Sequence, residues 1–220
     1  MPDFLSFAER YFPYILKGAV VTLELTVLSL IISVAFGLIA AVCKLSGRFT
    51  ISAAANVYIE LVRGTPALLQ LFVIYFGLTS YGVNLNSFTA AVLTLGFIGG
   101  AYLAEVFRAG IESVDRGQVE AAVSLGMRPG PVMRRIILPQ ALVLTLPPFT
   151  NFVIALVKDT SLASTILVTE LLRKAQEIAA PSFDFFTLYG VAAVYYWVVC
   201  LVLSFNQNRL ETRLSRYVAA

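Results

Sequence analysis

The sequence predicts an all-α integral membrane protein, a single domain over residues 1–220 with about five transmembrane helices. Composition gives the first reason: 59% of the residues are hydrophobic and 13% are charged, whereas soluble domains carry roughly 25% charged residues. The second reason is that the apolar residues form continuous runs rich in Leu, Val, Ala and Ile, and a bilayer core about 30 Å thick requires about 20 such residues per helix. A β-barrel would show short alternating segments instead, and the length leaves no room for an appended soluble domain.

The predicted spans follow from these runs and from the polar residues between them. In chain order they are Val20–Val42, Ala53–Tyr81, Phe88–Phe107, Ile136–Val157 and Phe185–Phe205. Charged and helix-breaking residues interrupt the early part of the second run: Glu60, Arg63, Gly64 and Pro66. Prolines, which remove backbone donors, interrupt the fourth: Pro139, Pro147 and Pro148. A cleavable signal peptide is not expected, because the chain opens with charged residues and the first apolar run lacks an A-x-A-like site.

Basic residues orient the predicted bundle. One side receives Lys44, Arg48, Arg108, Arg116, Arg128, Arg134, Arg135, Arg209, Arg213 and Arg216. The opposite side receives Arg10, Lys17, Lys158, Arg173 and Lys174. The side richer in Lys and Arg belongs in the cytoplasm, so we expect an outside N-terminus, a cytoplasmic C-terminus and a cytoplasmic loop between the third and fourth spans. An odd number of spans also disfavours two equal inverted repeats, a common plan of secondary transporters.

The sequence offers few side chains suited to catalysis or metal binding. It contains no histidine, the commonest metal ligand and acid–base group. Cys43 and Cys200 lie in or beside apolar runs and are interpreted as packing residues rather than a disulfide or a metal site. No nucleophile–base pair is visible, so an intramembrane enzyme is disfavoured and no metal site is predicted.

The loop between the third and fourth spans has the pattern of a short helix. Asp115 is a predicted N-cap, and Gln118 is placed to reach back to it as in a capping box. Gly126 suits the C-terminal stop, and the prolines that follow forbid continuation. The pattern alone leaves two interpretations open: a connector that lies on the bundle's own end, or a docking element for a cytoplasmic partner.

The same loop resembles the EAA loop of bacterial ABC importer permeases at every spacing of that motif. The matching residues are Glu120-Ala-Ala, then Gly126 after three residues, Ile136 after nine more, and Leu138-Pro139 after one more. Further segments are similar to the polar amino-acid permeases of that superfamily (the histidine, glutamate, glutamine, arginine and opine type): Ile59–Pro66 with Gln70, Ala101–Arg108, Gly117-Gln118, Leu138–Ala141 and Lys158–Leu162. The resemblance spans roughly residues 17 to 210.

This resemblance implies a type I importer permease of MetI-like architecture in a bacterial plasma (inner) membrane. Such permeases pair with a second copy or a homologous permease, and an extracytoplasmic amino-acid-binding protein delivers the substrate. A coupling loop of about residues 112–135 seats on an ABC ATPase subunit, and the implied coupling residues are Gln118, Glu120, Ala121, Ala122 and Gly126. This chain has no Gly-x-x-x-x-Gly-Lys-Ser/Thr loop, so ATP and Mg²⁺ are expected on the ATPase, and the chain itself is predicted to be neither an enzyme nor a cofactor carrier. The other expected partners are the amino acid and membrane lipid, with no nucleic acid.

Polar residues in or beside the spans are the candidates for substrate binding. The six are Gln70, Glu105, Asn151, Asp159, Thr160 and Ser161. An ionisable group inside a span costs about 2.5–3.5 kcal/mol, so it usually faces a cavity or a partner. Glu105 stands three residues before Arg108, and the two could pair with each other or contact a substrate ammonium. Glu60 and Arg63 have the same spacing, and there the pattern favours local pairing.

The end of the fourth span suggests a place for the substrate carboxylate. Thr160 or Ser161 resembles the N-cap of a helix that starts near Leu162, and exposed N–H groups at such an end favour an anion. The alternative is a turn at the outer surface. Pro147 and Pro148 free carbonyls about four residues back, which is compatible with a pathway-lining helix or with a packing kink.

We therefore interpret the chain as the permease subunit of an importer for a polar or charged amino acid. The alternative function is a free-standing ion-coupled carrier or channel. The loop separates the two interpretations, because a carrier has no use for a docking helix held in the cytoplasm.

Overall fold

The computed structural model describes the backbone of residues 4–218 and the side chains of residues 11–212, and the regular secondary structure of this part of the chain is entirely helical. The side chains of Arg10, Arg213 and Arg216, used above for orientation, lie outside it. The α-helices are α1 (Phe4–Lys44), α2 (Phe49–Gly64), α3 (Ala67–Phe72), α4 (Ser87–Glu112), α5 (Arg116–Ser124), α6 (Pro129–Val132), α7 (Leu138–Asp159), α8 (Leu171–Ser182) and α9 (Phe185–Val218). Short π-helical turns (Val73–Gly77 and Met133–Ile137) follow α3 and α6, and a 3₁₀-helix (Thr160–Ile166) follows α7.

Four helical stretches are long and apolar enough to cross a membrane: Tyr11–Lys44, Ser87–Glu112, Pro129–Ile166 and Phe185–Thr212. Helix α2 and the segment Ala67–Gly77, which holds α3 and the π-helical turn after it, together make a fifth candidate span. The two halves of this span meet at 105°. The backbone is extended at Thr65 and Pro66. Thr65 leaves the helical conformation because a residue directly before proline avoids it. The expectation of about five spans is therefore confirmed, with the second span broken where Pro66 interrupts the apolar run.

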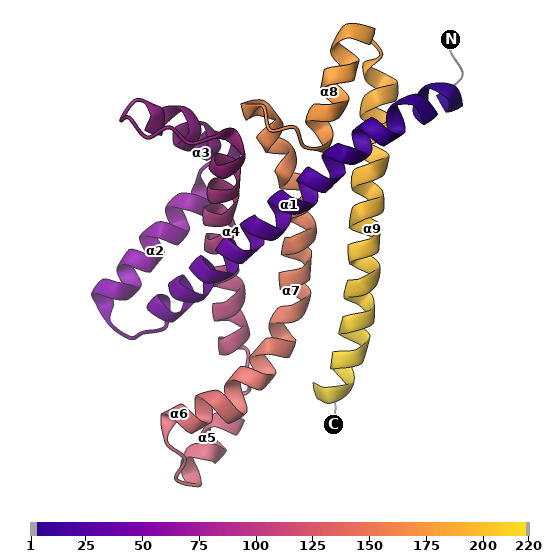
Figure 1. Cartoon of the computed structure of the whole chain (residues 1–220). Helices are drawn as coiled ribbons and strands as arrows, with labels where there is room; N and C mark the ends of the chain where they lie inside the picture. Colours follow the sequence, from indigo (N-terminus) through magenta and orange to yellow (C-terminus); the bar gives the residue numbers. More distant parts are fainter. Residues whose placement is uncertain (1–3, 219–220) are drawn as a thin grey trace.

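Helix α1 crosses the bundle diagonally and packs along α4 (Figure 1). Glycines allow this close approach, because a Cβ at Gly96 would collide with Ile32, one at Gly99 with Ser33, and one at Gly100 with Phe36. The Ser33 hydroxyl, buried at this contact, donates to the Ser29 carbonyl at 2.7 Å.

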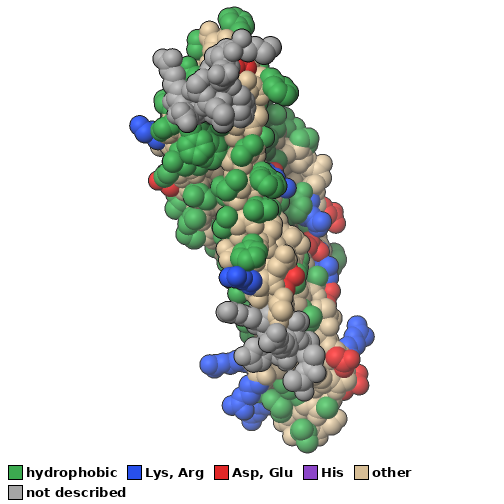
Figure 2. All heavy atoms as spheres, turned by 90° about the vertical axis from the view of Figure 1, so that its right-hand side faces the viewer, with side chains coloured by type: hydrophobic (Ala, Val, Ile, Leu, Met, Phe, Trp, Pro, Cys, Tyr) green, Lys and Arg blue, Asp and Glu red, His purple; other side chains and the backbone are tan. Residues whose placement is uncertain are grey.

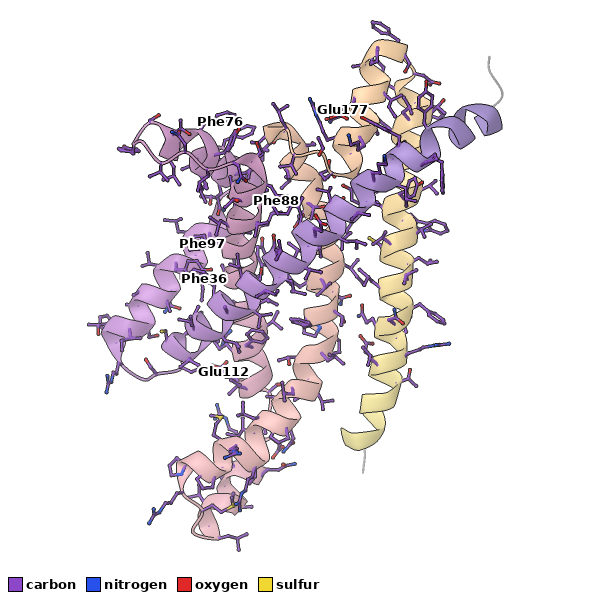
Figure 3. The ribbon with its side chains drawn as sticks, viewed as in Figure 1. Phe36, Phe76, Phe88, Phe97, Glu112 and Glu177 are labelled. Carbon is purple, nitrogen blue, oxygen red and sulfur yellow. The ribbon has the colours of Figure 1, made fainter. Side chains whose placement is uncertain are left out.

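Aromatic rings fill the space where α1, α2 and α4 meet. The rings of Phe36 and Phe97 are 5.6 Å apart and packed edge to face (Figure 3). The Tyr58 hydroxyl on α2 donates to the Phe97 carbonyl on α4 at 2.6 Å. A partly buried tyrosine hydroxyl usually finds such a partner, and this hydrogen bond links α2 to α4.

The bundle has two distinct ends. Helices α5 and α6 project from one, here called the α5 end, toward which α1 and α9 terminate; the opposite α8 end carries α8 and the start of α1 (Figure 1). On the face drawn in Figure 2, Lys and Arg side chains gather toward the α5 end, and hydrophobic side chains cover much of the rest. The termini of the described backbone thus lie at opposite ends, as an odd number of spans requires.

A buried carboxylate anchors α8. Glu170 is fully buried and caps the helix by accepting from the backbone N–H groups of Leu172 at 3.0 Å and Arg173 at 2.7 Å. The Tyr196 hydroxyl on α9 donates to the same carboxylate at 2.6 Å. The Leu171 N–H donates to Thr22 on α1 at 3.2 Å. This cluster ties α8 to both α1 and α9.

Candidate functional site

A groove of about 620 Å³ runs between the end of α2 and the facing sides of α4 and α7. Its lining residues are Arg63, Tyr102, Glu105, Val106, Ala109, Gly110, Ser113, Leu144, Pro148, Asn151, Phe152 and Ala155. Two of the six predicted substrate-binding residues, Glu105 and Asn151, meet here from different helices. The groove is mostly apolar, with a few convergent polar groups, which is the usual composition of a small-molecule site.

Glu105, among the lining residues of α4, is also the centre of a charged cluster. Its Oε1 accepts from the Lys44 ammonium at 2.6 Å, and its Oε2 accepts from Arg108 at 2.8 Å. Arg108 also pairs with Glu112, whose position at the end of α4 is labelled in Figure 3. Of the two alternatives that the sequence left open for Glu105, the structure shows the pairing with Arg108, and Lys44 adds a second cation from α1.

Arg63 enters the groove from the end of α2. Its guanidinium lies over the Tyr102 ring, 5.3 Å from the centroid, a cation–π arrangement. Within residues 11–212 it makes no ion pair with Glu60, so the expectation of local pairing is wrong. The guanidinium instead packs on the aromatic face of Tyr102, a contact between α2 and α4 that the spacing along α2 does not show.

Helix α7 supplies the opposite wall. It stays helical through Pro147 and Pro148, and the Thr150 hydroxyl donates to the Pro147 carbonyl at 3.0 Å. Asn151 lies one turn beyond Pro147 and accepts from Gln207 on α9 at 3.2 Å. Because Pro148 and Asn151 both line the groove, the structure agrees with the lining interpretation of this helix.

The expected helix start at Thr160 or Ser161 is wrong. Helix α7 passes directly into the 3₁₀-helix, and the Thr160 N–H is bonded to the Leu156 and Lys158 carbonyls of the preceding turn. Thr160 is buried, and its hydroxyl donates to Val157 at 2.6 Å. The helix that follows begins at Leu171, with Glu170 as its cap. The backbone donors near Thr160 are therefore used within the helix and do not form an anion site.

The predicted residues outside the groove fall in two other places. Ser161 lines a separate hollow of about 520 Å³ with Lys158, Tyr196 and Trp197, and Asp159 and Thr160 lie in the same stretch of chain. Gln70 lies in α3, and its amide reaches back across the bend to donate to the Val62 carbonyl at 2.8 Å and to Thr65 Oγ1 at 2.8 Å.

Sequence reasoning missed two residues. The sequence indicates only on which side of the membrane Lys44 lies, because its pairing with Glu105 depends on how α1 crosses α4. Glu170 caps α8 in the structure, but glutamate is not among the preferred N-cap residues, so the sequence gives no strong signal for this role.

The α5 helix has the predicted ends. The Asp115 carboxylate accepts from the Gly117 N–H at 2.7 Å. At the other end Gly126 has φ +77°, and the Gly126 and Met127 N–H groups bond to the Val123 and Ala122 carbonyls, which is a Schellman motif. The capping box is wrong, because the Gln118 side chain instead accepts from Gln140 at 2.5 Å.

One face of α5 is covered and the other is free in the isolated chain. Ala122 is buried, whereas Glu120 and Ala121 are exposed. Val123 is 58% exposed and Leu125 is 84% exposed. Two large apolar side chains are therefore exposed where α5 ends.

Comparisons with known proteins agree with this architecture. A family model described as "Binding-protein-dependent transport system inner membrane component" matches residues 33–216. The L-cystine transport system permease protein TcyB of Bacillus subtilis is 42% identical over 212 residues, which cover 96% of this chain and 91% of the relative. The crystal structure of an amino acid ABC transporter with histidines superposes with a TM-score of 0.92 at 41% identity, covering 97% of this chain and 99% of that one.

A more distant structure supports the fold alone. The inward-facing MetNI methionine ABC transporter aligns with a TM-score of 0.77 at 18% identity, covering 91% of this chain and 96% of that one, so the MetI-like architecture is confirmed. The chain belongs to the family of binding-protein-dependent transport system inner membrane components: it is a non-catalytic, multi-pass inner membrane permease subunit without a cofactor, which works with a separate ABC ATPase and a binding protein.

Proposed function

We propose that this permease forms the pathway through which an ABC importer takes up a polar or charged amino acid. The observation that carries the proposal is the groove, which brings the cation Arg63 and the carboxylate Glu105 to one mostly apolar space of about 620 Å³. An amino acid presents a carboxylate, which the Arg63 guanidinium can attract. Glu105, already paired with Lys44 and Arg108, sets the charge around the substrate ammonium. The names of TcyB and of the amino acid transporter structure support the same substrate class.

Within this proposal, Glu105 and Asn151 contact the substrate, and Arg63 joins them as a third residue of the groove. Gln70, Asp159, Thr160 and Ser161 stay predictions. The position of Gln70 supports a structural contribution, since its amide holds the bend of the broken span.

The α5 helix is proposed as the docking element for the ATPase, within a coupling loop of about residues 112–135. Glu120 and Ala121 are exposed and available to a partner, next to the two exposed apolar side chains at the end of the helix. Ala122 is buried against its own chain and sets the angle of the helix. Gln118, through Gln140, links that helix to α7, which lines the groove. Gly126 closes the helix.

The α5 end is proposed to face the cytoplasm, with the N-terminus outside and the C-terminus inside. The gathering of Lys and Arg at that end (Figure 2) supports this orientation. A second permease copy or a homologous permease completes the pathway. Its presence is supported by Glu24, which is exposed in the middle of the first span, because an ionisable group at that depth normally faces a partner or a watery cavity.

Reconstitution tests the function. Purified alone in liposomes, the chain should not accumulate radiolabelled amino acids; with its ATPase, ATP and binding protein, it should. Concentrative uptake by the chain alone under a proton or sodium gradient would instead establish the ion-coupled carrier.

A further inference from the structure

A ladder of four alternating charges runs from the end of α1 down the last turns of α4. Its members in order are Lys44, Glu105, Arg108 and Glu112, joined by three ion pairs. Two cations and two anions balance, so the ladder carries no net charge. The Glu105 side chain is the one rung that lines the groove.

The two oxygens of Glu105 have different partners. Arg108 directs its Nε and Nη2 to Oε2, at 3.1 and 2.8 Å, while its Nη1 is engaged by Glu112. Oε1 is bonded by the Lys44 ammonium at 2.6 Å. Lys44 is therefore the residue that neutralises the oxygen to which a substrate cation would otherwise bind.

Arg63 is the remaining charge of the groove. Among the described residues it has the Tyr102 ring as its partner and no carboxylate. The lining itself holds one cation, Arg63, and one anion, Glu105. Because the ladder neutralises Glu105 from outside the lining, Arg63 leaves the groove and its surroundings with a net positive charge, which attracts a carboxylate and repels a substrate that carries an additional positive charge.

We propose that Lys44 sets the charge selectivity of the permease: the groove admits amino acids without net positive charge, with their carboxylate directed to Arg63. This inference rests on the proposed amino-acid import and narrows its substrate class. Lys44 does not line the groove, so it acts through Glu105 as a positioning residue. Without it the ladder has one excess negative charge, and a basic amino acid can supply the missing cation.

Binding to the permease–ATPase complex, without binding protein, tests the proposal directly. The complexes are placed in nanodiscs and loaded with radiolabelled L-glutamine. Unlabelled L-glutamine, L-glutamate and L-lysine are then titrated as competitors, and the Kd of each is obtained from the displacement. Wild type should bind lysine more weakly than the other two. Lys44→Met should shift the ratio of lysine to glutamine affinity by about tenfold in favour of lysine, and Lys44→Arg should restore the wild-type ratio.

Two further variants control the experiment. Lys17→Met removes an exposed cation from the N-terminal half of the same helix and should leave the ratio unchanged. Glu105→Gln leaves Lys44 unpaired and should shift preference the opposite way, toward glutamate, which tests the idea even if Lys44→Met fails to assemble.

Several outcomes would overturn the inference. An unchanged ratio in Lys44→Met, or an equal loss of all three ligands, would show that Lys44 is only structural. Tight lysine binding by wild type would refute the charge argument. If the wild-type complex binds none of the three amino acids while the complete importer still takes up amino acids, the groove is not the substrate site. If the complete importer takes up no amino acid, the proposed function itself is wrong.

Discussion

At the scale of single residues, Gly126 is the position where backbone geometry and proposed coupling meet. Its φ of +77° lies in the left-handed region, and a Cβ there would meet open space, so the cost of a substitution comes from the backbone alone. Gly126→Val should destabilise the end of α5 by about 1–2 kcal/mol. We expect the ATPase to copurify poorly and uptake to fall. Gly130→Val is the control, because Gly130 also faces open space but lacks a positive φ; equal effects of the two variants would contradict the prediction.

The buried carboxyl of Glu170 should make the stability of the folded protein fall as pH rises. Burial raises the pKa of its carboxyl above the usual range, although its hydrogen bonds oppose this. A carboxyl with a raised pKa binds its proton more tightly in the folded state. Its contribution to stability is therefore greatest at low pH and is lost as pH rises from about 4.3 through the raised value.

The comparison of Glu170→Gln with wild type checks that sign. The variant keeps an oxygen acceptor for the cap but cannot titrate, so its melting temperature should fall less than that of wild type as pH rises through this window. Asp184→Asn is the matched control, since Asp184 also accepts from a backbone N–H at a helix start, that of Thr187 at 3.2 Å. A wild-type slope retained in Glu170→Gln would refute the assignment.

Sequence reasoning succeeded for residues whose role is local. Asp115 and Gly126 were predictable because a cap and a left-handed stop depend on a few neighbouring residues. It failed for Gln118, whose side chain bonds to Gln140 on a distant part of the chain, and for Arg63, whose partner Tyr102 lies on another helix. The candidate site was accordingly predicted in part: Glu105 and Asn151 share a groove, but their neighbours could not be inferred without the packing of α4 on α7.

At the scale of elements, the free face of α5 is a surface that a partner must cover if it docks there. Leu125 is 84% exposed, so Leu125→Asp should change the permease's own stability by no more than about 0.5 kcal/mol. We expect it to weaken ATPase binding by about tenfold or more, because a charge would be buried in an apolar contact. Tyr81→Asp, at an 87% exposed position in the turn before α4, should leave binding intact. Undiminished ATPase binding by Leu125→Asp would favour the connector interpretation.

The sequence predicted the positions of the long helices better than the angles between them and their exact ends. The long spans follow from hydropathy, and the break in the second span follows from Pro66. The angle of 105° between its halves does not, since it depends on tertiary contacts such as that of Tyr58 with Phe97. The continuation of α7 through Thr160 was missed because Thr and Ser are compatible with both a cap and a helix interior when they bond back to a preceding carbonyl, as Thr160 does.

At the scale of the whole molecule, the two ends of the bundle should lie on opposite sides of the membrane. Ser124 on α5 and Ser182 at the end of α8 form a matched pair, because both are exposed and both hydroxyls donate four residues back, to Glu120 and Ile178. In a background with Cys43→Ser and Cys200→Ser, an impermeant maleimide should label Ser182→Cys in intact cells. Ser124→Cys should react only after permeabilisation, and the reverse pattern would invert the proposed orientation.

The order of the spans and the distribution of basic residues between them do not depend on tertiary contacts, so both follow from the sequence. The diagonal course of α1 was not predictable in this way. The path of α1 depends on which small residues of α1 and α4 face each other. A hydropathy pattern contains no information about such pairs.

The glycine-lined crossing of α1 and α4 has a consequence for sequence divergence. No methyl group can be added at Gly99 while a side chain the size of serine stands at position 33, nor at Gly100 beside Phe36. A lineage that gains bulk on one helix must lose it on the other or move the helices apart. Positions 33 and 99 should therefore change in pairs among relatives, and a relative with a larger residue at both would be expected to carry its first helix along a different path.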